Sequence, residues 1–245
     1  MKAAPERQLR LLDLQAIDTR LAQIRHARTH LPELVDLADL AHKAGLIDDQ
    51  LVRARTELDD IQREIARSES DVQQVRDRAA RNQSRLDAGT GTAKDLQALQ
   101  HELESLARRQ TELEDVELEI MERAENAESD VKELERGRGE LTTRITALEE
   151  ARDAKLADLA TEEAAVSAPR SGLVDELGPE LVTLYEKIRT SSGTGAAALS
   201  RRKCGGCQLE LNQVDLDRIR AAAADEVLRC EECRRILVRT AESGL

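Results

Sequence analysis

The sequence has almost no aromatic residues. It contains no Trp and no Phe, and Tyr185 is the single Tyr among 245 residues. A globular enzyme of this length normally fills its core with aromatic side chains, whereas here Leu, Ile, Val and Ala must do so. Because 35% of the residues are charged and Gly and Pro are few, the composition excludes one large globular core and indicates long helices.

Long apolar segments are missing as well. No run approaches the roughly 18 residues that suggest a membrane span, and the opening MKAAPERQLRLLDLQ lacks the apolar core of a secretion signal. We therefore expect a cytoplasmic protein with no membrane partner. In a reducing compartment, four cysteines in two close pairs indicate metal ligands sooner than disulfides.

Proline is absent from Glu33 to Ala168, and in this stretch apolar residues recur at alternate steps of three and four. Nine of ten such positions from Ile47 to Ala79 are apolar, as are fourteen of nineteen from Leu96 to Leu159, where Lys155 is one of the polar exceptions. A mean step of 3.5 residues keeps one stripe facing a partner helix. The pattern predicts a left-handed coiled coil.

The two helical stretches are predicted to pair as an antiparallel hairpin. Gly89 and Gly91 interrupt the first, and Thr92 with Asp95 is typical of the start of the second, so we expect the turn at about 87–94. Residues 6–86 and 95–167 would span about 120 Å and about 110 Å, which are similar lengths.

Pro32 leaves two alternatives for the start of the chain. It can kink one long helix, or the chain can reverse there and pack its first helix as the third of a short bundle; the kink is preferred. Gly137 and Gly139 each cost about 1 kcal/mol in a helix interior, so a bend or weak point is expected there.

The fold class is therefore mainly α, with a long antiparallel coiled-coil hairpin and a small C-terminal zinc ribbon with four cysteine ligands. We predict the hairpin at 1–168, a short helix and linker at 169–195 and the ribbon at 196–245. The short helix begins near Pro179 and carries an apolar face that includes Tyr185 and Ile188. This face should dock on the end of the coil or on the ribbon.

The ribbon prediction depends on the spacing C-x2-C-x22-C-x2-C, formed by Cys204, Cys207, Cys230 and Cys233. Two such turns present four thiolates at tetrahedral corners, which suits one Zn²⁺ at about 2.3 Å from each sulfur. Gly205 and Gly206 would permit the positive backbone angles of a tight knuckle. A segment of roughly 50 residues is too small to fold on burial alone, so metal binding would supply folding free energy.

The predicted zinc is structural. Four Cys ligands leave no open coordination position, and none of the four His residues lies near them in the sequence. A one-iron site has similar ligands, but no other feature supports a redox role. Carboxylates on coiled-coil helices are solvated, and Ser191 and Ser192 have no His nearby, so we predict no catalytic residue, no enzyme activity and no small-molecule substrate.

Several segments together resemble a known bacterial family that joins a long helical hairpin to a C4-type zinc ribbon and has flagellar-regulator-like relatives. They are LPEL at 31–34, AKDLQALQHELESL at 93–106, LVTLYEKIR at 181–189, CGGC at 204–207 and VLRCEECRRILV at 227–238. The resemblance implies that the four cysteines are the ligands. It also implies a regulatory or adaptor role, linked in some members to RNA or transcription-related partners. Arg234 stands where many relatives have Gly, and we expect it to distort that turn.

Charge is distributed unevenly around a net charge of −12. Residues 74–94, at the predicted turn, carry five cations and two carboxylates, a local charge of +3. Six cations flank the cysteine pairs. The candidate binding residues are Arg201, Arg202, Lys203, Arg229, Arg234 and Arg235 in the ribbon, and Arg76, Arg78, Arg81, Arg85 and Lys94 at the turn.

Two functions remain open at this point. The ribbon cations can bind nucleic acid through its phosphates, or they can balance the negative charge of four thiolates around one Zn²⁺. Missing aromatics argue against stacking on single strands. We prefer a non-enzymatic adaptor that binds a protein partner through its coiled coil and zinc ribbon, with nucleic-acid binding as the alternative. The sequence leaves the oligomeric state open.

Overall fold

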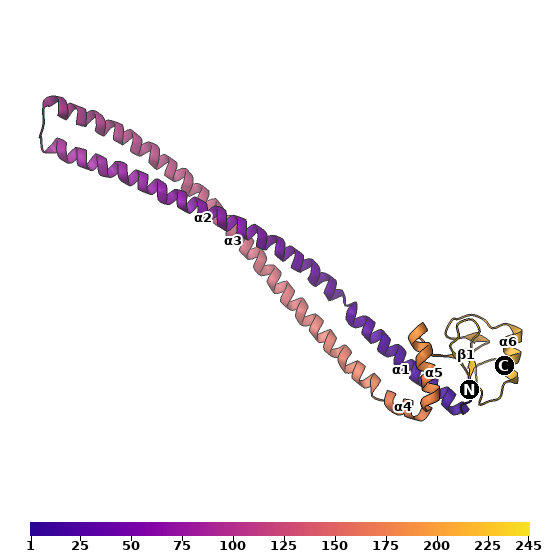
Figure 1. Cartoon of the computed structure of the whole chain (residues 1–245). Coiled ribbons are helices and arrows are strands. Elements are labelled where there is room, and N and C mark those ends of the chain that lie inside the picture. Colours follow the sequence, from indigo (N-terminus) through magenta and orange to yellow (C-terminus); the bar gives the residue numbers. More distant parts are fainter. The chain divides into compact units, whose positions relative to one another are not determined.

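The computed structural model describes residues 1–245, which form two compact units (Figure 1). Unit 1 consists of Met1–Leu34 and Glu150–Leu245, and unit 2 of Val35–Glu149. The prediction of a mainly helical chain, with a long hairpin and a small C-terminal region that holds the four cysteines, is confirmed. The elements are α1 (Pro5–Thr29), α2 (Pro32–Asp87), α3 (Ala93–Ser167), α4 (Arg170–Leu177), α5 (Pro179–Ser192), β1 (Ala196–Ser200), β2 (Lys203–Cys204), α6 (Gln213–Ala221), β3 (Leu228–Arg229) and β4 (Ile236–Arg239).

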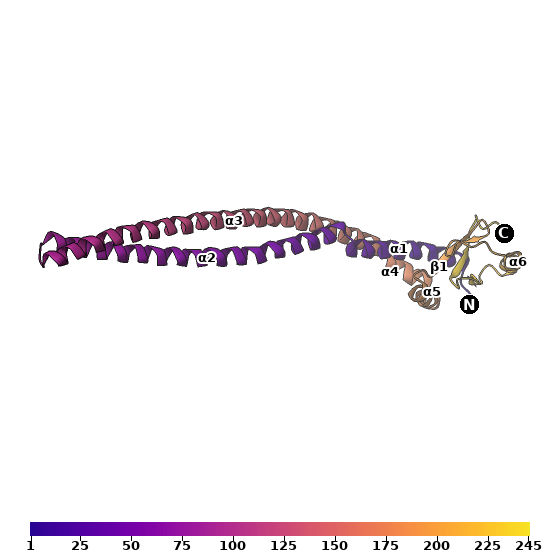
Figure 2. The same cartoon turned by 90° about the horizontal axis from the view of Figure 1, so that it is seen from above.

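In unit 2, α2 and α3 lie side by side and run in opposite directions (Figure 2). All ten positions predicted from Ile47 to Ala79 are buried or half-buried, and so are the predicted positions of α3 in this unit. The coiled-coil prediction is confirmed. Ion pairs also cross between the helices, namely Arg138–Asp48, Arg55–Glu135, Arg123–Glu64, Arg76–Glu114 and Arg78–Glu102.

The turn of unit 2 begins where α2 ends at Asp87, and α3 starts at Ala93. The backbone N–H of Thr92 donates to Oδ2 of Asp95 at 2.9 Å, and the N–H of Asp95 donates to Oγ1 of Thr92 at 3.3 Å. These reciprocal bonds satisfy donors that a helix N-terminus leaves free. The helix α3 then continues through Gly137 and Gly139, where a bend or weak point was expected, without interruption.

In unit 1, α1 ends at Thr29 and α2 begins at Pro32. Both pack antiparallel to the C-terminal part of α3, since Arg20 pairs with Glu162 and Glu33 pairs with Lys155. Within unit 1 the chain therefore keeps its direction from α1 through Leu34. Lys155 was predicted to lie on the stripe that faces the partner helix, but it is exposed, and its apolar neighbour Leu156 is half-buried instead. The prediction for position 155 is wrong.

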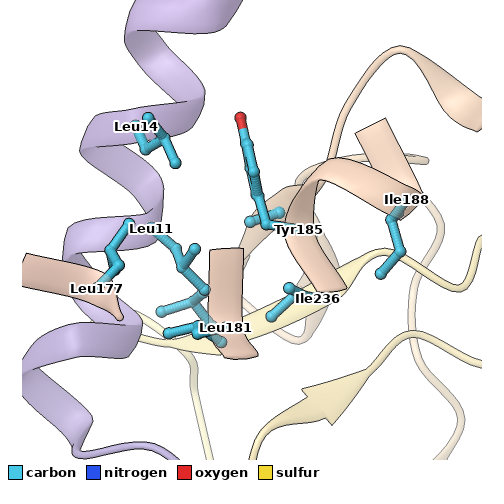
Figure 3. Close-up of a cluster of buried hydrophobic side chains, with 9 residues drawn as sticks. Leu11, Leu14, Leu177, Leu181, Tyr185, Ile188 and Ile236 are labelled. Carbon is cyan, nitrogen blue, oxygen red and sulfur yellow. The ribbon is translucent and has the colours of Figure 1, made fainter. Parts of the chain in front are cut away.

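The segment after α3 contains two short helices, α4 and α5, where we predicted one. Gly178 separates them with φ of 81°, a left-handed conformation that suits glycine. Tyr185 and Ile188 of α5 lie in one core with Leu11 and Leu14 of α1 and with Ile236 of β4 (Figure 3). The apolar face of α5 thus docks on α1 and on the ribbon at once.

The ribbon strands form one sheet in the order β2-β1-β4-β3. β1 is parallel to β4, while β2 and β3 are antiparallel to their neighbours. The N-terminus adds to this fold, because Ala3 donates to the carbonyl of Asp225 at 2.7 Å and Val227 donates to the carbonyl of Met1 at 3.1 Å. The ribbon shares its core with α1 and α5, and our three-segment division of the chain stays a prediction.

Candidate metal centre and binding surfaces

The four cysteines converge at one point of unit 1. Their Sγ atoms all lie within 4.8 Å of one another, with Cys204 and Cys233 3.8 Å apart and Cys207 and Cys230 3.9 Å apart. A tetrahedron with Zn–S bonds of about 2.3 Å has edges of about 3.8 Å. The spacing of the sulfurs therefore fits one tetrahedral Zn²⁺ held by all four thiolates.

The two cysteine turns have the same backbone conformation. The N–H of Gln208 donates to the carbonyl of Cys204 at 2.8 Å, and the N–H of Arg234 donates to the carbonyl of Cys230 at 2.9 Å. Gln208 and Arg234 have φ of 65° and 61°. The expectation that Arg234 distorts its turn is wrong: it adopts the left-handed conformation at a cost of roughly 1–2 kcal/mol.

The glycines between the first two cysteines have a different role from the predicted one. Neither Gly205 nor Gly206 has a positive φ. A Cβ on Gly205 would lie 3.0 Å from the carbonyl oxygen of Ala198, and one on Gly206 would lie 2.8 Å from Cδ of Arg235. These glycines let the knuckle approach β1 and the second cysteine turn closely.

Burial controls the acidity of the thiols when no metal is bound. It raises the pKa of Cys204 to about 12 and also raises the pKa of Cys230. Burial opposes ionisation of Cys233 too, but hydrogen bonds from the backbone of Arg235 and from the other thiols outweigh it and lower that pKa to about 7. Zn²⁺ favours the thiolate form and crosslinks the two turns. With four sulfur ligands and no open position, the centre is structural.

Four of the six predicted ribbon cations are engaged by neighbouring groups. Side chains of Arg201 and Lys203 are exposed and make no hydrogen bond or ion pair. The other four donate to Gln213 (Arg202, 2.6 Å), the carbonyl of Arg234 (Arg229, 2.8 Å), Glu231 (Arg234, 3.1 Å) and the carbonyl of Ser192 (Arg235, 3.2 Å). Only Arg234 meets a carboxylate, so the other five cations keep their charge, while hydrogen bonds to neutral groups fix the orientation of Arg202, Arg229 and Arg235.

At the turn of unit 2, carboxylates do reduce the local positive charge. Arg76 pairs with Glu114 and Arg78 pairs with Glu102, both of which lie outside residues 74–94. Adding these two carboxylates to the five cations and two carboxylates of the segment changes the local charge from +3 to +1. The pairing partners lie on the opposite helix, so local counting of charge overestimated the basic character of the turn.

Three large apolar side chains of residues 196–245 are exposed at positions that the charge and cysteine patterns did not indicate, and Leu245, at 39%, is the least exposed of them. Leu209 is 50% exposed and Val214 is 78% exposed. Val214 lies in the first turn of α6, whose N-cap Asn212 accepts a hydrogen bond from the N–H of Asp215 at 2.8 Å. An N-cap followed by Gln-Val-Asp signals the start of a surface helix and could have revealed this position.

A buried polar cluster joins α1 to α4 and α5. The Asp18 side chain is 3% exposed and accepts hydrogen bonds from the Tyr185 hydroxyl and from Nε of Arg170, both at 2.8 Å. Burial alone would raise the pKa of Asp18, but these two donors and the charges of Arg170 and Arg189 hold it below its ordinary value. Burial and the Asp18 carboxylate raise the pKa of Tyr185. These hydrogen bonds and ion pairs hold α1, α4 and α5 together in unit 1.

Comparisons with known proteins agree with this architecture. Residues 14–193 match the CT398-like coiled coil hairpin domain, and residues 203–237 match the C4-type zinc ribbon domain. A protein of Mycobacterium tuberculosis, strain H37Rv, is 38% identical over 239 residues, which is 98% of each chain. No helix of the structure combines the length and apolar character that crossing a membrane requires.

Solved structures show the same fold. A structure from Mycobacterium smegmatis is 38% identical, with a TM-score of 0.88, and the match covers 98% of this chain and 100% of that one. The structure of CT398 from Chlamydia trachomatis is 19% identical, with a TM-score of 0.69 over 96% of this chain and 98% of that one. At that identity the likeness concerns the fold alone.

Proposed function

This chain belongs to the family of CT398-like coiled-coil hairpin proteins that carry a C4-type zinc ribbon, and from this we propose that it is a non-enzymatic adaptor that binds a protein partner. In the proposal the zinc holds the ribbon in shape, and the surfaces of the ribbon and of the coiled coil make the contacts. A cytoplasmic location is part of the same proposal.

The exposed apolar pair on the ribbon is the observation that carries the proposal. Leu209 and Val214 are the two most exposed large apolar side chains of the ribbon, whereas its core residues, such as Leu216, Ile219 and Leu237, are buried. Removing apolar surface from water stabilises an interface by roughly 25 cal/mol per Å² of area covered. A ribbon that binds a protein partner through this pair gains free energy from covering them.

Nucleic-acid binding is the second candidate, and one observation favours it. Arg201 and Lys203 flank Arg202 at the turn between β1 and β2, and their side chains are exposed and without a partner. Phosphates are bound by such free cations, with an affinity that falls steeply as salt rises. Arg234 pairs with Glu231, and hydrogen bonds within the protein leave Arg202, Arg229 and Arg235 fewer free donors for phosphates, so this candidate is the weaker of the two.

One capture experiment distinguishes the candidates. The zinc-loaded full chain is immobilised, and bound proteins and bound nucleic acids are identified in the same eluate by mass spectrometry and sequencing. A double variant, Leu209→Asp with Val214→Asp, is compared with Arg201→Ala combined with Lys203→Ala. We expect a set of specific proteins that the first variant loses and the second retains.

Opposite results would contradict the adaptor proposal. Retention of every protein by the Asp variant would show that the apolar pair does not bind a partner. Recovery of nucleic acid that the Ala variant loses, with salt-dependent affinity in a filter-binding titration, would favour the second candidate. Zinc content and Tyr185 fluorescence, measured for each variant, establish that the fold is unchanged.

A further inference from the structure

The outer face of α2 in unit 2 carries an exposed stripe with few charges. Its members follow each other at alternate steps of three and four, and Val35 and Val52 at its ends are 73% and 67% exposed. This outer stripe consists of Val35, Ala38, His42, Gly45, Asp49 and Val52. Leu46, beside Gly45, is 51% exposed. Further along the same face the residues are mostly polar, including Asp59, Arg63, Ser70, Gln73 and Asp77.

Gly45 has no role in the packing of its own unit. It lies in the interior of α2, and a Cβ added there would meet no atom within 4 Å. Glycine in a helix interior costs about 1 kcal/mol relative to Ala. A partner helix could approach the α2 backbone closely at this point, because no side chain stands there.

The outer stripe is complementary to itself in the antiparallel direction. When two copies of α2 cross about a twofold axis between Lys43 and Ala44, Val35 of each copy lies opposite Val52 of the other. In the same register His42 lies opposite Gly45 of the other copy, so that a large ring meets the position without a side chain. A twofold interface uses the same patch on both copies and needs this kind of self-complementarity.

Charges on one flank of the stripe favour the same arrangement. Asp39, Leu46 and Arg53 are spaced one heptad apart and therefore share one side of α2. An antiparallel second copy brings Arg53, which has no ion pair within the chain, near Asp39 of the other copy and brings the two Leu46 side chains together. A parallel copy would place like charges beside each other. Charge complementarity thus selects an antiparallel second copy as the occupant.

We propose that this protein self-associates through the outer stripe, with α2 of one copy packed antiparallel against α2 of a second copy. The stripe from Val35 to Val52 is about 26 Å long. One helix pair of that length buries less than the roughly 1,200 Å² of a stable interface, so the dimer dissociates readily. This association is separate from the proposed partner binding by the ribbon.

Sedimentation equilibrium of the zinc-loaded full chain, from low micromolar to several hundred micromolar, tests the association. Gly45→Glu is compared with Gly139→Glu, a matched control in α3 whose added Cβ also meets nothing within 4 Å. Both variants replace helical glycine by a better helix former and add one negative charge. We expect wild type and Gly139→Glu to dimerise alike, and Gly45→Glu to dissociate about tenfold more readily, because its side chain would fill the space that the His42 ring of the other copy occupies.

Two results would overturn the proposal. One is a wild-type chain that stays monomeric over the whole range, and the other is a Gly45→Glu variant that dimerises as the wild type does. Charge exchange tests the register. Arg53→Asp and Asp39→Arg should each weaken the dimer, and their combination should restore it. If the double variant is weaker than both single variants, the antiparallel arrangement is wrong.

Discussion

Replacing Asp18 by Ala should destabilise unit 1 and leave unit 2 unchanged. The substitution removes a buried carboxylate that accepts hydrogen bonds from the Tyr185 hydroxyl at 2.8 Å and from Arg170 at 2.8 and 3.3 Å. Removing one partner of a buried pair costs about 3–5 kcal/mol, because the remaining charge loses its compensation. Arg170 keeps Glu186, and the Tyr185 hydroxyl keeps Gln15, so we expect about 3 kcal/mol.

Tyr185 provides the assay, since it is the single aromatic fluorophore of the chain and is fully buried in the core of unit 1. With a urea dependence of about 1–3 kcal/mol/M, a loss of about 3 kcal/mol lowers the midpoint of the fluorescence transition by about 1–3 M. Asp13→Ala is the matched control on the same helix. Asp13 is exposed and pairs with the exposed Arg10, so its removal should change stability by less than about 1 kcal/mol.

The pH dependence of the free energy of unfolding is a second test of the role of Asp18. The pKa of Asp18 is lower in the folded chain than in the unfolded one, so its contribution is present above about pH 4 and is lost as the pH falls through the folded value. The difference in stability between wild type and Asp18→Asn should be constant from pH 5 to pH 7. Equal urea midpoints for Asp18→Ala and Asp13→Ala would refute the role assigned to the cluster.

Three further predictions concern unit 1. Elemental analysis should find one zinc per chain. Cys207→Ser or a strong chelator should remove the zinc and lower the urea midpoint of the Tyr185 fluorescence transition. The circular dichroism of the unit 2 helices should persist. Gly195→Ala should cost about 1–3 kcal/mol by urea unfolding, because its Cβ would lie 2.5 Å from the Tyr185 ring, whereas Gly172→Ala, with nothing within 4 Å, should be neutral or stabilising. Arg234→Gly should raise the stability of the zinc-loaded chain by about 1 kcal/mol in the same titration, since it relieves the left-handed strain; an unchanged midpoint would contradict this.

The features that the sequence predicted correctly depend on residues close together in the chain. The steps of three and four from Ile47 to Ala79 determine which side of the helix is buried, because helix geometry alone places those side chains on one stripe. Thr92 and Asp95 cap α3 across three residues. The zinc site was predictable for a similar reason, since each Cys-x-x-Cys turn is local and four thiolates together are best stabilised by one metal ion.

The features that the sequence could not predict depend on segments far apart in the chain. The charge at the hairpin turn was overestimated because Arg76 and Arg78 find their carboxylates on α3. The ribbon is also stabilised by packing on distant segments, because Ile236 and Val238 share a core with Leu11 of α1. Asp18 and Tyr185 are separated by 167 residues, and only their common burial brings the carboxylate to the hydroxyl. Periodicity and spacing therefore determined the hairpin and the metal ligands. Tertiary packing decided which charges stay free and which apolar side chains stay exposed, because both depend on what the rest of the chain covers.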